Sequence, residues 1–201
     1  MGSSRDHERF QQVLSQYDTA ESFIKAVEAR QSGVSLPAVN QLRYAGHHLL
    51  RGLANENDEV YEKGLNDAVD HCQRAMYEAS EAGIIYYLDL LKAFGEDYSE
   101  IPLGDAAPVH MRAKKLAGEV VNTLSQGRLN RESAEHQASE YMGMFEKLSE
   151  VVEDLELHRD ELDKVLRSHA QEARRFLLQT AFWIVMPIIA VAGVLVTILC
   201  C

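Results

Sequence analysis

The stretch 181–201 constrains the fold of this chain more than any other. It reads AFWIVMPIIAVAGVLVTILCC, 21 residues without a charged side chain, and Arg174 and Arg175 precede it. At about 1.5 Å of rise per residue, a helix of this length covers the roughly 30 Å hydrocarbon core of a bilayer. A buried core helix would normally keep a polar face, and here only Thr197 is polar. The stretch therefore predicts a transmembrane helix, with a buried or packed core helix as the alternative.

The flanking charges predict how such a helix would be oriented. Basic residues mark the cytoplasmic edge of a span, so the Arg174–Arg175 pair places the rest of the chain in the cytoplasm. We expect a single-pass, tail-anchored protein of the inner (cytoplasmic) membrane, with the anchor over 176–201 and the lipid bilayer as a partner. The net charge of −11 argues against a broad nucleic-acid surface, although it leaves room for a small basic pocket.

Apolar residues recur at three- and four-residue steps along most of the chain, which predicts helices over 5–30, 37–55, 58–94 and 107–124. No segment alternates apolar and polar residues as a strand does. The pattern predicts an all-α fold with a helical bundle over 1–130. The second and third helices are expected to pack as an antiparallel pair. Their predicted facing stripes are Val39, Leu42, Gly46, Leu49, Leu50 and Leu53, against Val60, Leu65, Val69, Cys72, Met76 and Ala79.

From Ala138 onward the apolar spacing becomes a strict alternation of three and four, as in the seam of a coiled coil. This predicts a stalk over 131–175 that continues into the tail as one helix of nearly 70 residues. A charge such as Arg159 within the seam usually sets register or oligomer state, so the chain is expected to form a homo-oligomer. Packing of the N-terminal half of the seam onto the first or the fourth helix of the same chain is an equal alternative. The predicted seam residues are Phe145, Leu148, Val152, Leu155, Arg159, Leu162 and Leu166.

Two short stretches carry residues suited to chemistry. Arg43, His47 and His48 lie on the second helix, and His71 and Arg74 lie on the third, with Tyr77 one turn beyond. An arginine can stabilise the charge that develops on a phosphate, and an imidazole can move the proton of a ribose 2′-hydroxyl. The residues thus form a candidate metal-independent endoribonuclease site, with Arg43, His47 and His48 as catalytic candidates and His71, Arg74 and Tyr77 in supporting or binding roles.

The helical period decides which of these side chains share a face. On an unbroken helix His47 lies about 40° from Arg43 and His48 lies about 140° away. The catalytic hypothesis therefore requires His47, or a break at Gly46. The alternative is structural: Arg43, His47, His71 and Arg74 bond to acidic residues across the two helices and lock the bundle.

The Arg43–Tyr44–Ala45–Gly46–His47–His48 stretch resembles the HEPN superfamily, small helical domains that often carry an arginine followed, after four to six residues, by a histidine; Arg43 and His48 match the Arg-x4-His spacing. The resemblance covers 35–124 and implies ribonuclease activity in bacterial immunity or toxin systems. Together with the predicted anchor, it is similar to the membrane-associated accessory proteins of type VI CRISPR systems. Tyr44 departs from the family, which prefers a polar residue directly after the arginine.

The leading hypothesis is an accessory effector of bacterial antiviral defence that acts on RNA, on membrane integrity, or on both, with RNA or an RNA-guided nuclease as a partner. The alternative is a non-enzymatic coiled-coil tether, scaffold or oligomeric pore. No metal-binding motif and no phosphate-binding glycine loop occur in the sequence, so neither a metal nor a small-molecule cofactor is expected.

Overall fold

The chain is helical throughout the part that the structure describes. In the computed structural model the backbone is described for 4–31, 33–127 and 134–200, and the side chains for 7–31, 33–126, 138–183 and 185–186. Over these residues there are six helices and no strand, so the predicted all-helical character is confirmed. The helices are α1 (Ser4–Gln31), α2 (Leu36–Leu53), α3 (Asp58–Asp97), α4 (Ala106–Gly127), α5 (Ala134–Glu156) and α6 (Arg159–Cys200).

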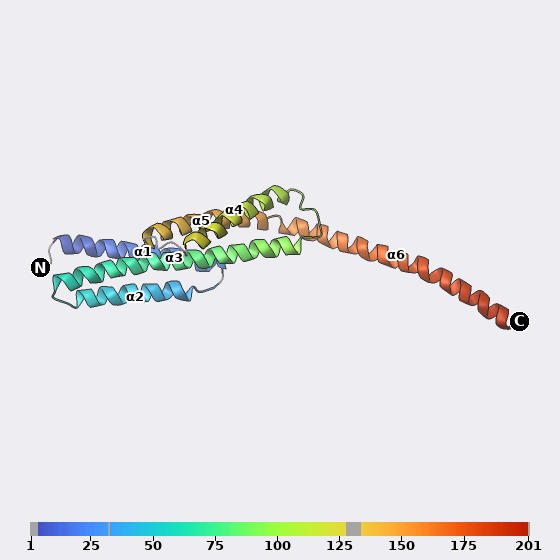
Figure 1. Cartoon of the computed structure of the whole chain (residues 1–201), viewed down its shortest axis with the longest axis horizontal. Helices are drawn as coiled ribbons and strands as arrows, with labels where there is room; N and C mark the ends of the chain where they lie inside the picture. The colour runs from blue at the N-terminus through green and yellow to red at the C-terminus, as the bar shows by residue number, and fades with distance from the viewer. Residues whose placement is uncertain (1–3, 32, 128–133, 201) are drawn as a thin grey trace.

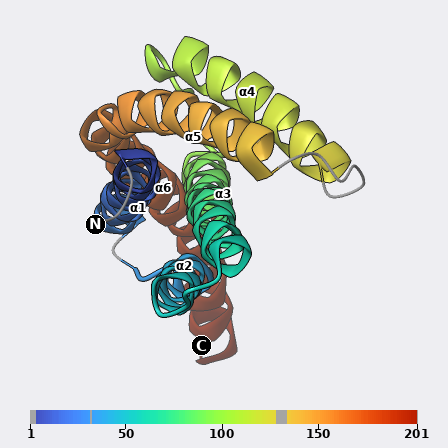
Figure 2. The ribbon, with the colours of Figure 1, turned by 90° about the vertical axis from the view of Figure 1, so that its left-hand side faces the viewer.

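The 40-residue helix α3 is the centre of the fold and packs against α1, α2, α4 and α5. Figure 2 shows the order of the layers, with α2 on one side of α1 and α3, and α5 and then α4 on the other. Helix α6 leaves this bundle near the end of α3 and extends away from it (Figure 1). The Asn57 side chain starts α3 by accepting hydrogen bonds from the backbone amides of Glu59 and Val60.

Gly83 explains how α5 reaches α3. A Cβ atom at this position would lie only 2.5 Å from Cε2 of Phe145, so the absent side chain is what admits the Phe145 ring. The ring is 1% exposed and packs edge-on against Phe23 of α1, with centroids 5.9 Å apart. Gly83 therefore serves close packing between three helices.

The prediction of one continuous helix from stalk to tail is wrong. The chain turns at Leu157 and His158, so that α5 ends at Glu156 and α6 begins at Arg159. Arg159 lies at this junction, where its Nε donates to Glu156 at 2.6 Å and its Nη1 donates to Asp97 of α3 at 2.9 Å. Its guanidinium also lies over the Phe94 ring, 5.5 Å from the centroid. The charge in the seam thus ties the start of α6 to the end of α3 of the same chain.

The predicted seam is largely filled from within the chain. Phe145, Leu148, Val152, Leu155 and Leu162 are all buried in the core of this single chain, and Leu166 is partly buried against it. Packing within the chain is therefore confirmed as far as Leu162, with the fourth helix as an expected partner of α5 and α3 as a partner that was not expected. Beyond Leu166 the described side chains of α6 are exposed.

The predicted transmembrane helix over 176–201 requires a correction. Over the described residues, no helix combines the length and the apolar composition that crossing a bilayer demands. Charged side chains recur in α6 from Arg159 to Arg175, and charges are costly in the hydrocarbon core of a bilayer. The predicted single-pass location in the inner membrane is wrong on the same finding. The rest of the predicted anchor, 187–201, lies outside the described side chains.

Candidate functional site

Helices α2 and α3 approach each other unusually closely where their two glycines meet. A Cβ on Gly64 would lie 2.8 Å from the Cα of Gly52 and 2.9 Å from the carbonyl oxygen of His48. Ala38 and Ala45 are also buried at this interface, at 0% and 1% exposure. Small side chains thus let the two backbones touch, and the longer side chains at the edge of the contact are brought together.

The side of α2 that faces α3 differs from the predicted stripe. Val39, Leu50 and Leu53 were expected to face inward, and they are 42%, 69% and 49% exposed. The buried positions are Leu42, which the stripe includes, and Ala38, Ala45 and Gly52, which it does not. The helix is rotated because alanine and glycine allow a closer approach than a row of leucines would.

Two imidazoles stack across this contact. The ring of His48 lies nearly parallel to that of His71, with centroids 5.0 Å apart and an interplanar angle of 23°. His48 Nδ1 is 3.3 Å from the Asp67 carboxylate, and His71 Nδ1 is 2.7 Å from Oε1 of Gln41. The Tyr44 ring lies beside His71, at 5.6 Å between centroids. The histidines therefore form a pair in which each ring is held by a different polar partner. We call His48, Asp67, His71 and Gln41 the histidine pair site.

The environment of His71 favours its neutral form. Burial lowers the pKa of His71 below its ordinary value of 6.5, and the nearby charges of His48 and Arg74 lower it further, while Asp67 and Asp70 act in the opposite direction. Because the Gln41 oxygen can only accept, the bonded Nδ1 carries the proton and Nε2 keeps its lone pair. His71 is thus a neutral base at pH 7.

The predicted Arg-x4-His pair is not brought together. Helix α2 is continuous from Leu36 to Leu53, so there is no break at Gly46. Arg43 is exposed, and its guanidinium lies over its neighbour Tyr44, 5.2 Å from the ring centroid. His48 faces α3 instead. His47 is exposed on the outer side of α2 and touches His48 edge-on at 5.8 Å between centroids.

The predicted supporting residues divide between two places. Arg74 lies one turn from His71 and acts on it through its charge. Tyr77 lies on the α5 side of α3, where its ring packs on Tyr141 at 4.8 Å between centroids. Burial raises the pKa of Tyr77, and the hydrogen bond with Tyr141 raises it further. Tyr77 thus belongs to the α3–α5 packing and lies away from the histidine pair site.

Sequence reasoning missed Asp67 and Gln41 as partners of the two histidines. Their signal was present in the helical spacing, because Gln41 and His48 lie seven residues apart on α2, and Asp67 and His71 lie four apart on α3. Each spacing puts the two side chains on one face of its helix. Only the relative rotation of the helices shows that these faces meet.

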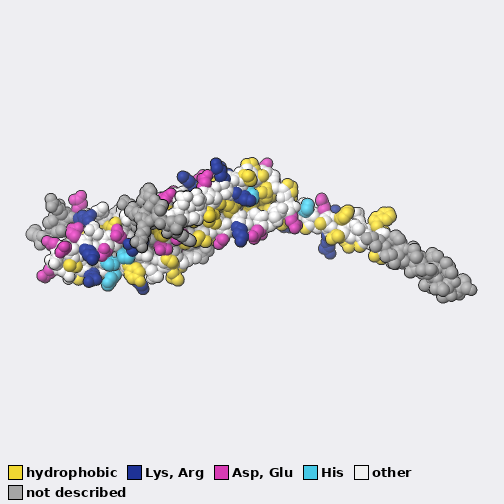
Figure 3. Space-filling view, viewed as in Figure 1, with side chains coloured by type: hydrophobic (Ala, Val, Ile, Leu, Met, Phe, Trp, Pro, Cys, Tyr) yellow, Lys and Arg dark blue, Asp and Glu magenta, His cyan; other side chains and the backbone are white. Residues whose placement is uncertain are grey.

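Histidines gather over α2 and α3 in the space-filling view, at the end of the molecule away from α6 (Figure 3). Lys and Arg side chains lie beside them on the same face. Among the described residues, no group of three or more His, Cys, Asp or Glu side chains is arranged to hold a metal ion. Cys72 is buried close by on α3, and burial raises the pKa of its thiol to about 11, so the thiol stays protonated at neutral pH.

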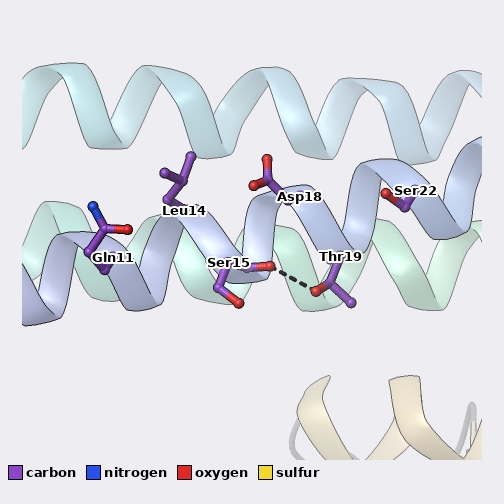
Figure 4. Close-up of a pocket in the computed structure, with 6 residues that line it drawn as sticks. All are labelled: Gln11, Leu14, Ser15, Asp18, Thr19 and Ser22. Atoms are coloured by element: carbon purple, nitrogen blue, oxygen red, sulfur yellow. Dashed lines mark hydrogen bonds between the residues drawn. The ribbon is translucent and has the colours of Figure 1, made fainter.

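Two other pockets offer less chemistry. The pocket between α3 and α4, of about 440 Å³, contains His110. Burial lowers the pKa of His110, and the charge of Lys114 lowers it further. The pocket in Figure 4 is formed by α1 alone, and its side chains point to different sides of that helix. Its lining residues are Gln11, Leu14, Ser15, Asp18, Thr19 and Ser22.

Comparison of the chain with protein-family models, with curated proteins and with solved structures finds no match. The chemistry of the histidine pair site is therefore what indicates a function.

Proposed function

We propose that the histidine pair site is a metal-independent acid–base site that cleaves the phosphodiester bonds of RNA. The observation that carries the proposal is the stacking of His48 on His71 at 5.0 Å, with a carboxylate on one ring and an amide oxygen on the other. Such an arrangement supplies two proton-transfer groups at one place, which is what cleavage of RNA by its own 2′-hydroxyl needs.

The two rings take different roles. His71 accepts the proton of the ribose 2′-hydroxyl at Nε2, since its Nδ1 is held by Gln41 and its pKa is lowered. The 2′-oxygen attacks the phosphorus, and the bond from phosphorus to the 5′-oxygen breaks. His48, oriented by Asp67, gives a proton to that leaving oxygen. The products are a 2′,3′-cyclic phosphate and a free 5′-hydroxyl.

Arg74 is a cation that acts on this centre, because its charge lowers the pKa of His71. In the proposed reaction it stabilises the negative charge that builds on the phosphate oxygens. Arg43, by contrast, is exposed beside Tyr44 on the neighbouring face of α2, where it contributes to binding of the RNA strand rather than to proton transfer.

The HEPN resemblance and the role in antiviral defence beside an RNA-guided nuclease stay hypotheses. They agree with the proposed reaction class and rest on the Arg43–His48 motif alone.

The proposal is tested with the purified full chain and a single-stranded RNA labelled at its 5′ end, in buffer that contains EDTA. Replacing either His48 or His71 with alanine should slow cleavage about 100-fold or more, the range for loss of a general acid or base. His169→Ala is the matched control, because it removes an exposed histidine from α6. The proposal fails if both site variants cleave at the rate of the unchanged chain.

Two further variants separate this site from the sequence motif. Arg43→Ala and His47→Ala remove the pair that lies on one face of α2. If Arg43 and His47 carry the reaction, these changes abolish cleavage and His71→Ala does not. If the histidine pair site carries the reaction, His71→Ala abolishes cleavage and the changes at Arg43 and His47 do not.

A second candidate function is that of a self-associating helical scaffold, and the exposed surface of α6 favours it. Phe176, Leu177, Phe182 and Trp183 are 69%, 67%, 60% and 76% exposed. Contiguous apolar surface of this kind usually marks an interaction site, and a second copy of the chain supplies a matching surface.

Sedimentation velocity tests the scaffold. The unchanged chain is expected to sediment as an oligomer, and the double variant Phe176→Arg/Trp183→Arg as a monomer. Leu157→Arg changes an 81% exposed apolar residue outside this surface and is the control. A monomeric unchanged chain at micromolar concentration would exclude the scaffold and leave the RNA proposal standing.

A further inference from the structure

A pocket of about 260 Å³ lies next to the histidine pair site, where the end of α2 meets the first turns of α3. His48 and Asp67 form the end nearer to the histidine pair site, and Gly52 and Gly64 lie where the two backbones touch. The full lining is His48, Arg51, Gly52, Val60, Lys63, Gly64 and Asp67.

Two cations of this pocket are not neutralised by an acidic side chain. Arg51 and Lys63 are exposed, and neither has an ion-pair partner among the described side chains. The one carboxylate of the lining, Asp67, lies 3.3 Å from Nδ1 of His48. Glu62, the neighbour of Lys63 in sequence, is directed to Arg9 at 3.5 Å. The far end of the pocket therefore carries two cations with no acidic side chain within ion-pair distance among the described residues, on a chain whose net charge is −11.

The position of these cations relative to the histidines follows from the helical repeat. Arg51 lies three residues after His48 on α2, and Gly64 lies three residues before Asp67 on α3. Each step is close to one turn, so the pocket is displaced from the histidine pair site by about 5 Å along the helices. The two glycines close the floor of the pocket, because a Cβ on Gly64 would already meet the α2 backbone at 2.8 Å, so a ligand is held by the side chains of Arg51 and Lys63.

A phosphate group fits this arrangement. The Arg51 guanidinium offers a planar fork of donors, the Lys63 ammonium adds a point charge, and both are the usual protein ligands of phosphate. We propose that the pocket formed by Arg51, Lys63 and the Gly52–Gly64 contact binds the phosphate that neighbours the cleaved one in a single-stranded RNA. The identity of the ligand as RNA rests on the proposed function, whereas the phosphate chemistry rests on the pocket alone.

The binding test uses a fluorescein-labelled oligodeoxyuridylate, which lacks the 2′-hydroxyl and therefore cannot undergo the proposed cleavage. The double variant Arg51→Gln/Lys63→Gln should bind it about tenfold more weakly, as measured by fluorescence anisotropy at fixed salt. The dependence of log K on log salt should also become shallower by about 0.7, the change expected when the protein neutralises one phosphate fewer on a single strand.

Lys25→Gln/Lys92→Gln is the matched control, since it removes the same amount of charge from exposed positions on α1 and α3. It should keep affinity within twofold. The inference is overturned if the control weakens binding as much as the pocket variant, if the pocket variant binds as the unchanged chain does, or if the unchanged chain shows no binding. All variants alter exposed side chains, and circular dichroism checks that their helical content is unchanged.

A second measurement separates free phosphate from the phosphate of a nucleic acid. Inorganic phosphate should shift the backbone amide signals of Gly52 and Gly64 in NMR spectra, and the oligonucleotide should shift the same signals at lower concentration. Shifts with inorganic phosphate alone overturn the assignment to a nucleic acid.

The outcomes also separate this pocket from the catalytic proposal. If Arg51→Gln/Lys63→Gln weakens oligonucleotide binding while His71→Ala leaves RNA cleavage unchanged, the pocket stands and the catalytic role of the histidine pair fails. If His71→Ala abolishes cleavage while the pocket variant binds normally, the catalytic role stands and the pocket inference fails.

Discussion

Gly64 lies where α2 and α3 are closest, and replacing it with alanine tests how the histidine pair site is held together. The added Cβ would lie 2.8 Å from the Cα of Gly52 and 2.9 Å from the carbonyl oxygen of His48. Both are backbone atoms, so neither can rotate out of the way. The two helices must separate by about 0.6 Å to restore the 3.4 Å of an ordinary contact.

The magnitude follows from two opposing effects. Forcing an extra carbon into a packed contact costs about 1–3 kcal/mol, and the backbone clash places Gly64→Ala in the upper part of that range. Alanine in place of glycine inside a helix contributes about 1 kcal/mol in the favourable direction. We expect a net loss of about 1–2 kcal/mol.

Gly46→Ala is the control, because a Cβ at Gly46 meets nothing within 4 Å on the same helix pair. It should stabilise the chain by about 1 kcal/mol through helix propensity alone. The difference between the two alanine variants then isolates the cost of the clash, about 2–3 kcal/mol.

Urea unfolding followed by far-ultraviolet circular dichroism gives both free energies. We expect a lower urea midpoint for Gly64→Ala than for the unchanged chain, and a higher one for Gly46→Ala, at equal slopes. An equal or higher midpoint for Gly64→Ala than for Gly46→Ala would refute the close approach of the helices. Gly64→Ala should also slow RNA cleavage, since it moves His48 away from His71, whereas Gly46→Ala should not.

Three further outcomes are expected. Arg159→Met should destabilise the chain by about 1–2 kcal/mol in urea unfolding, between the values for exposed and buried ion pairs, and should speed amide hydrogen exchange in the first turns of α6 because the bond to Asp97 is removed. Burial lowers the pKa of His71 below 6.5, so the unfolded chain takes up this proton first as the pH falls. The contribution of His71 to the free energy of unfolding is thus present above about pH 6.5 and is lost as the pH falls below it. His71→Gln should therefore flatten the dependence of the unfolding free energy on pH below about 6.5, and an unchanged profile would contradict the lowered pKa. Gly83→Ala should cost about 1–2 kcal/mol in thermal unfolding, because the new Cβ meets the Phe145 ring at 2.5 Å, and a neutral result would show that the ring moves aside.

The helices themselves could be predicted from the sequence because their apolar spacing is regular. The predicted range 58–94 lies within the observed α3, Asp58–Asp97, and the predicted first helix, 5–30, lies within Ser4–Gln31. The break between α5 and α6 could not be predicted in this way, because the three-and-four spacing runs through Leu157 and His158 without interruption. The turn depends on Arg159 finding an acidic partner on α3, which is a tertiary contact.

The candidate site, like the fold, could be predicted from the sequence only in part. The sequence drew attention to His48 and His71, which do meet, but it grouped His48 with Arg43 through the Arg-x4-His spacing. Large apolar side chains outweigh alanine and glycine in any count of hydrophobic residues, so the small positions Ala38 and Ala45 were not recognised as the contact face. The rotation of α2 that follows from them decides which polar residues are neighbours.

The junction at Arg159 has a mechanical consequence. Helix α6 is held over its first two turns, about 10 Å, by Arg159 and by the bond from Tyr98 Oη to Asp163, and its backbone then continues for about 50 Å to Cys200. By the ratio of these two lengths, a sideways force on the far end of α6 produces a force about five times larger at the contacts of its first two turns. The load enters α3 at Asp97, and α3 is the same rigid helix that carries His71. Tension or torque on the free end of α6 would therefore reach the histidine pair through one continuous helix.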